Sequence, residues 1–156
     1  MLRILGLAVS HLIALGVGFA LGIYLLPILT AAPSPEAEVL ASEASEATYR
    51  VELTRDLAGS DALHWGEGTI SVSPTAIVHQ GELAPGPDYR LYLTSGFVED
   101  EAQFEAIKDS AAYVGDVKSF EGFLLDVPEA VDVEQYDTVV VWCETFGEFI
   151  TAGKYR

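Results

Sequence analysis

The sequence predicts an all-β domain, an antiparallel β-sandwich with one short helix, that follows a single N-terminal transmembrane helix. Three observations lead to this prediction. Residues 4–29 contain no charged side chain. From residue 49 onward, short runs of apolar and β-branched residues recur every 8 to 15 residues, with Gly and Pro between them. These runs do not alternate with long helical patterns, which argues against a parallel α/β sheet.

Residues 1–30 are predicted to form a transmembrane signal anchor. The uncharged stretch Ile4–Leu29 has 26 residues, and a helix needs roughly 20 apolar residues to cross a bilayer. A cleavable signal peptide has a shorter apolar region, of about 7 to 15 residues. The length therefore favours an uncleaved anchor, with cleavage near the small residues 30–32 as the alternative.

The orientation of this anchor follows from the flanking charges. Arg3 precedes the span and only acidic residues follow it closely. The positive-inside rule then places the N-terminus in the cytoplasm and the C-terminal domain outside, in the periplasm or at the cell surface. Gly18 and Gly22 have the spacing that lets two membrane helices pack closely, which makes a weak homodimer through these glycines an open expectation.

Residues 31–48 are predicted to be an acidic linker. They consist mainly of Ala, Ser, Pro and Glu and include no aromatic residue. Such a segment buries too little apolar surface to order itself, so we expect a tether that carries at most a short, frayed helix.

Residues 49–156 are predicted to form the β-sandwich domain. Residues 49–53 and 68–72 alternate apolar and polar side chains, which is typical of half-buried strands. Acidic residues open the segment 99–108, and apolar residues follow at helical spacing, so this segment is the predicted short helix. The other expected strands are 76–79, 89–93, irregular pieces within 113–120, 123–127, 138–143 and 146–151.

The charge of this domain excludes one class of partner. It holds 20 of the 24 acidic residues and seven of the eight basic residues, which leaves a net charge of −13. Phosphate backbones would repel such a surface, so nucleic acid is not an expected partner, and anionic lipid headgroups are disfavoured for the same reason. The acidity is read as a solubility feature, with docking to a basic protein as the alternative.

Cys143 is the leading candidate site residue because it is the only cysteine and ends the most apolar strand, Thr138–Cys143. By strand period it shares a face with Val139 and Val141, which favours burial as a small hydrophobe. Its position at a strand end, next to Glu144, would also let it meet a pocket. An unpaired thiol is unusual outside the cytoplasm, so both interpretations stay open.

The sequence does not supply a complete catalytic constellation, so whether the protein is an enzyme stays open. Neither a hydrolase motif nor a phosphate-binding loop is present. His64, His79 and Cys143 are the ligand types of a blue-copper centre, but the axial Met is missing because the only Met is residue 1, and this disfavours copper. With a single cysteine, a zinc site built from cysteine pairs is excluded. A thiolate or imidazole could still be an axial ligand of haem.

Four stretches, in this order, resemble the DM13 domain family: 57–68 (LAGSDALHWGEG), 83–93 (LAPGPDYRLYL), 114–122 (VGDVKSFEG) and 136–143 (YDTVVVWC). The resemblance covers about residues 49–155. It implies an all-β domain related to DOMON-like sandwiches, found in extracytoplasmic proteins. It also implies a redox or electron-transfer role in which the family's cysteine, matched by Cys143, acts as a bare thiol or as a ligand to a prosthetic group such as haem.

Two functional hypotheses follow from these residues and the resemblance. In the first, the chain displays one DM13-type domain outside the cytoplasm, Cys143 is its redox thiol or cofactor ligand, and His64 is a weaker cofactor-binding candidate. Because one such domain has no attached oxidoreductase domain, this hypothesis requires a redox or surface protein as a partner. In the second, the domain is a non-catalytic binding or scaffold module and Cys143 is a core residue.

Overall fold

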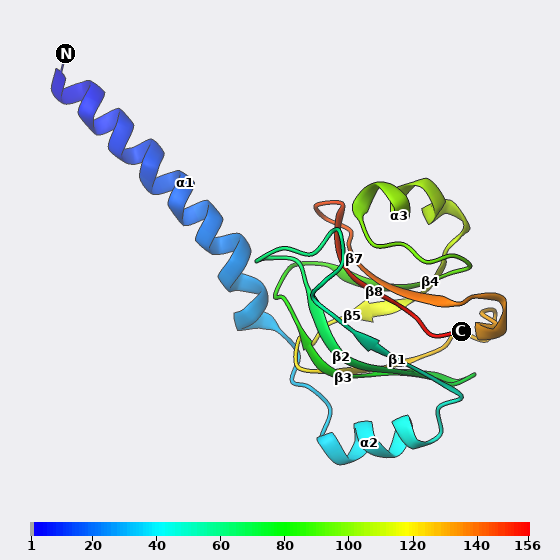
Figure 1. The fold of residues 1–156 in the computed structure, drawn as a ribbon. Helices are drawn as coiled ribbons and strands as arrows, with labels where there is room; N and C mark the ends of the chain where they lie inside the picture. The colour runs from blue at the N-terminus through cyan, green and yellow to red at the C-terminus, as the bar shows by residue number, and fades with distance from the viewer. Residues whose placement is uncertain (1) are drawn as a thin grey trace.

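The computed structural model describes residues 2–156, and the first of its elements is the long helix α1 (Leu2–Thr30). Its 29 residues correspond to about 43 Å of helix at 1.5 Å per residue. None of its residues is buried, and its most apolar window has a mean hydropathy of 2.4. The helix is therefore long and apolar enough to cross a membrane, although an N-terminal signal sequence would pass the same test. Figure 1 shows α1 running away from one end of the folded domain.

Two four-stranded antiparallel sheets form the body of the domain, which confirms the predicted all-β antiparallel sandwich. The strand order is β1-β2-β3-β6 in the first sheet and β5-β4-β7-β8 in the second. The strands of the first sheet are β1 (Tyr49–Leu53), β2 (Gly66–Val72), β3 (Ala76–Leu83) and β6 (Phe123–Asp126). Those of the second sheet are β4 (Tyr89–Thr94), β5 (Ala112–Val117), β7 (Thr138–Cys143) and β8 (Glu148–Lys154).

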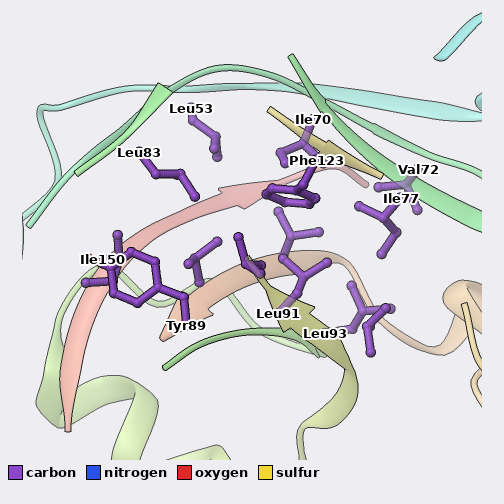
Figure 2. Packing of buried hydrophobic residues seen from close by; sticks show 14 of the residues in the cluster. Leu53, Ile70, Val72, Ile77, Leu83, Tyr89, Leu91, Leu93, Phe123 and Ile150 are labelled. Atoms are coloured by element: carbon purple, nitrogen blue, oxygen red, sulfur yellow. The ribbon is translucent and has the colours of Figure 1, made fainter. Parts of the chain in front are cut away.

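The main hydrophobic core lies between the two sheets. Strand β7 is buried along all six residues, and its inward face carries Val139, Val141 and Cys143, as the strand period predicted. Figure 2 shows side chains of this core cluster, among them Ile70 and Ile77 from the first sheet and Leu91 and Leu93 from the second. The core thus fixes which face of the second sheet points inward.

The predicted helix at 99–108 is α3 (Glu101–Ile107), followed by a 3₁₀ turn (Lys108–Ser110). The Asp100 carboxylate accepts a hydrogen bond from the Gln103 amide at 2.8 Å and caps the first turn. Phe104 packs against Trp142 and Phe149 on the outer face of the second sheet. A second 3₁₀ turn spans Val133–Gln135.

The segment 31–48, predicted as a linker, contains the helix α2 (Ala37–Ser45). The sequence did not predict that this helix packs on a sheet. Its Leu40 and Ala44 pack against Val78 and Leu124 on the outer face of the first sheet, and α2 lies beneath that sheet in Figure 1. The Arg50 guanidinium donates a 2.8 Å hydrogen bond to the Ala44 carbonyl near the end of the helix. The sheet therefore supplies the apolar partner that the segment lacks by itself.

Two hydrogen bonds fix the chain between α1 and α2 to the domain. The Ala32 amide donates to the Lys118 carbonyl at 2.9 Å, and the Ser34 hydroxyl donates to the Glu121 carbonyl at 2.9 Å. Only Ala31 separates the end of α1 at Thr30 from the first of these contacts. The folded domain is thus held close to the C-terminal end of α1.

Candidate functional site

The candidate site lies at the end of the sandwich nearest α1, where strand β4 begins and strand β7 ends. Antiparallel pairing places Tyr89 directly opposite Cys143. The turn that leads into β4 passes over these strand ends, and its Asp88 adopts a positive φ of 55°. The Asp88 carbonyl accepts a 3.0 Å hydrogen bond from the Glu144 amide, which ties this turn to the end of β7.

Cys143 is buried, with 3% of its surface exposed, and belongs to the main core cluster. Its thiol donates a hydrogen bond to the Pro87 carbonyl at an Sγ–O distance of 3.0 Å. Burial raises the pKa of the thiol above its ordinary value, and the Asp88 and Glu148 carboxylates act in the same direction, although backbone amides of Phe146 and Thr145 oppose the shift. The thiol is therefore protonated at neutral pH.

His64 lies in the loop between β1 and β2, where Asp61 organises the backbone. The Asp61 carboxylate accepts hydrogen bonds from the amides of Leu63 at 2.7 Å and His64 at 2.8 Å. It also contacts the His64 Nδ1 atom at 3.1 Å. These contacts orient the imidazole ring, about a quarter of which remains exposed.

The two residues named as candidates from the sequence line one pocket of about 340 Å³, called here the Cys143 pocket. Besides Cys143 and His64, its walls come from the start of β4, the β7–β8 turn and the C-terminal half of α1. They include Tyr24, Leu63, Tyr89, Phe146 and Ile150. Leu63 and Phe146 remain about half exposed, so the mouth of the pocket is apolar.

His79 is not part of this pocket. It is fully buried in β3, its Nε2 atom lies 3.0 Å from the Glu67 carbonyl, and its ring packs on Phe123 with centroids 5.1 Å apart. Burial lowers the pKa of this imidazole. Within residues 2–156, no group of three or more His, Cys, Asp or Glu side chains is placed to hold a metal ion. The set of two histidines and one cysteine considered for copper is therefore not assembled.

Glu144, the residue after Cys143, points away from the pocket. Its carboxylate accepts hydrogen bonds from the Tyr92 hydroxyl and, at 2.9 Å, from the Lys108 ammonium. These groups lie on the outer side of the second sheet, near α3. The Glu144 carboxylate therefore binds Tyr92 and Lys108 and is not a partner of the thiol.

Tyr89 is a site residue that the sequence analysis treated only as part of a strand. It is 2% exposed, and burial raises the pKa of its phenol. It borders both the Cys143 pocket and a larger cleft of about 790 Å³ between α1 and the end of the domain, called here the α1 cleft. Gly86 lies against the phenol so closely that an added Cβ would fall 2.7 Å from the ring. The sequence Pro85-Gly86-Pro87-Asp88 before the strand is typical of a turn, and this was the available hint.

The fold and the site define a class of protein: a small β-sandwich that presents one thiol and one imidazole in an apolar pocket at the end near an apolar helix. A thiol and an imidazole are both groups that proteins use as ligands to a prosthetic group.

A family model described as "Electron transfer DM13" matches residues 52–155, two thirds of the chain. The chain belongs to the DM13 family, as its motifs indicated, and this membership supports a redox-related role. The search of curated proteins and the search of solved structures returned no match.

Proposed function

We propose that this chain is a single-pass membrane protein whose DM13 domain lies outside the cytoplasm and takes part in electron transfer through Cys143. The observation that carries the proposal is that Cys143 and His64, far apart in sequence, line the same apolar pocket. Family membership supplies the class of function. The anchor and its orientation rest on the length of α1 and on Arg3, which precedes the uncharged span.

The donor set in the pocket fits a haem or a similar prosthetic group. Cys thiolates and His imidazoles are both ligands that proteins offer to haem iron, so Cys143 would hold the iron and His64 is the second candidate. The group would supply a one-electron couple. The chain itself would contribute an apolar wall that excludes water, and the Asp61 carboxylate would orient the imidazole. Ligation would require that the thiol give up the proton it shares with the Pro87 carbonyl.

The bare-thiol version needs a partner protein that carries a disulfide. The Cys143 thiolate would attack one sulfur of that disulfide, a mixed disulfide would form, and the second sulfur would leave as a thiolate, so electrons balance without a further oxidant. The raised pKa keeps the thiolate fraction small at neutral pH, and this version would therefore be slow.

The burial of Cys143 within the core cluster favours the second candidate function, a binding or scaffold module. In that case Cys143→Ala would cost stability, roughly 1 to 2 kcal/mol, and would leave partner binding intact. A basic surface on a partner protein would complement the acidic domain.

A visible spectrum and a thiol titration of the full-length chain, produced in an oxidising compartment, test these versions. If haem is bound, an absorption band is present, Cys143→Ser abolishes it, and His64→Gln shifts it while the matched variant His79→Gln does not. If the thiol acts alone, the native protein forms a mixed disulfide with an aromatic disulfide reagent at pH 9. A colourless protein whose native thiol resists that reagent contradicts both versions and leaves the scaffold function.

A tag after Arg156 tests the orientation. Antibody should bind the tag while the cytoplasmic membrane is intact, on whole cells or after an outer membrane, where there is one, has been opened. Binding only after the cytoplasmic membrane is permeabilised would contradict the proposed location.

A further inference from the structure

We propose that the α1 cleft and the adjoining Cys143 pocket bind an isoprenoid quinone, a neutral membrane-soluble molecule with a carbonyl head. This inference rests on the proposed function in one respect: the domain must stand at the outer face of a membrane that α1 crosses. It assigns a ligand to a site that the DM13 match does not describe.

The length of α1 places the cleft at the bilayer surface. The uncharged stretch Ile4–Leu29 spans about 39 Å as helix, and the hydrocarbon core of a bilayer is about 30 Å thick. With Arg3 at the cytoplasmic side, about six residues of the apolar stretch extend beyond the core on the outer side. The α1 wall of the cleft runs from Gly18 and Gly22, which by this count lie inside the core, to Leu26 and Pro27, which lie beyond it, so the cleft crosses the outer surface of the core.

The contacts that follow α1 hold the domain near this level. The Ala32 amide bonds to the Lys118 carbonyl two residues after the helix ends. The same end of the domain exposes Leu63 and Phe146, at 55% and 48% of their surface. Exposed apolar side chains beside an apolar cleft would contact the interfacial layer of the bilayer. A ligand dissolved in the membrane can thus reach the cleft without crossing water.

Tyr89 supplies the second, independent observation. Its side chain is 98% buried, and within residues 2–156 its hydroxyl forms no hydrogen bond, although it borders both cavities. The other buried tyrosines of the folded domain, 7% and 6% exposed, have partners: Tyr92 donates to Glu144 and Tyr155 donates to the Val133 carbonyl at 2.8 Å. The hydroxyl oxygen of Tyr89 is not among the enclosed polar atoms without a partner, so it opens onto the cavities and can donate to a ligand there. A carbonyl oxygen in the cavity would be the acceptor.

The charges around the cleft select a neutral head. Asp88 and Asp116 line the α1 cleft, Glu148 lines the Cys143 pocket, and Lys118 is the one Lys or Arg among the described residues that border either cavity. An anionic phospholipid head would meet more negative than positive charge there. A quinone presents only carbonyl oxygens and an apolar chain, and it is the neutral lipid whose chemistry suits an electron-transfer domain.

Saturable photolabelling tests the proposal on the full-length chain in phosphatidylcholine nanodiscs, with an azido-benzoquinone that carries a decyl chain as the probe. The wild type should be labelled within the segments 18–27 and 85–89, with saturation and with competition by unlabelled decyl-benzoquinone. Tyr89→Phe keeps the ring and removes the donor, so the half-saturating mole fraction should rise roughly threefold to tenfold, which corresponds to one neutral hydrogen bond.

Matched variants separate the site from general effects on the membrane protein. Gly22→Leu fills the cleft from the helix, where an added Cβ meets open space, and should abolish saturable labelling. Gly6→Leu, at the other end of α1, and Tyr92→Phe, on the other face of the second sheet, should leave it unchanged. Equal labelling in Gly22→Leu and Gly6→Leu, or labelling that does not saturate, would overturn the proposal.

Two further outcomes distinguish the ligand from its alternatives. If dioleoylglycerol or phosphatidylglycerol competes as well as unlabelled decyl-benzoquinone, the site takes lipids in general and the assignment to quinones is wrong. Cys143→Ser should retain labelling, because Tyr89 holds the head. If the protein binds quinone but shows neither haem nor a reactive thiol, the quinone site is supported and the proposed role of Cys143 is contradicted. If it shows haem or a reactive thiol but does not bind quinone, the role of Cys143 is supported and the quinone site is contradicted.

Discussion

Replacing Leu40 by Ala tests whether the segment between α1 and the domain is docked, since docking holds the end of the domain beside α1. Leu40 is 5% exposed and packs with Ala44 on Val78. The change removes three carbon atoms from this contact, which at about 0.8 kcal/mol per buried CH₂ corresponds to about 2 kcal/mol. If the docking of α2 is weakened by this free energy, α2 detaches more often and its amides exchange about 30-fold faster. The effect cannot exceed the docking free energy itself, because α2 can detach while the sandwich stays folded.

Hydrogen exchange measured by mass spectrometry on the full chain in nanodiscs checks this magnitude. Amides of 37–45 should be protected in the wild type and should exchange faster in Leu40→Ala, while those of β3 should not change, because β3 stays paired with β2 and β6. Val39→Ala is the matched control on the same helix, since Val39 is 44% exposed. If wild-type α2 exchanges at the rate of an unstructured chain, or if both variants exchange alike, the segment is a free tether and the docking is wrong.

Three further predictions follow from the same structure. Because burial raises the pKa of Cys143, alkylation by iodoacetamide should be slow at pH 7 and should accelerate at a higher pH than for a free cysteine; a rate profile matching that of free cysteine would contradict the burial. Because burial lowers the pKa of His79, the unfolded chain binds the proton more readily than the folded chain. The urea midpoint of unfolding should therefore fall as the pH drops below about 6.5, and His79→Leu should lose this part of the pH dependence. Gly81→Ala would push a Cβ into the Glu67 carbonyl and within 2.7 Å of the Gly68 Cα atom, so it should lower the free energy of unfolding by about 3 kcal/mol or more. Gly96→Ala has open space around it and should lower the free energy of unfolding by less than about 1 kcal/mol. Equal unfolding midpoints for the two variants would contradict the close approach of the strands.

Local pattern predicted the strands well wherever the side chains themselves carry the signal. The apolar run 138–143 is β7 with the same bounds, and 49–53 is β1 with the same bounds, because each has the composition and period of a strand. Strand β2 begins two residues earlier than predicted, at Gly66. Its first residues have low β propensity, and they are extended because they pair with β3, where Gly66 lies opposite Leu83.

Contacts between distant segments could not be predicted in this way. The docking of α2 depends on only two apolar side chains four residues apart, and the sheet that receives them comes from strands later in the chain. The same limit applies to the site. Cys143 and His64 were candidates by residue type, but the pairing that sets Tyr89 opposite Cys143, and the loop that brings His64 to the same pocket, are properties of the register and of the β1–β2 connection.

The two versions of the Cys143 proposal differ in what they require of one proton. At rest the thiol is buried, donates to the Pro87 carbonyl and lies near the Asp88 and Glu148 carboxylates, and each of these features disfavours a thiolate. An attacking thiolate would form against this environment with no cation from the described pocket residues to compensate. A bound metal centre brings its own positive charge and deprotonates a coordinating thiol outright. The electrostatics of the pocket therefore favour the ligand version over the bare thiol, and a spectrum that lacks an absorption band in a protein with a rapidly reacting thiol would refute this order.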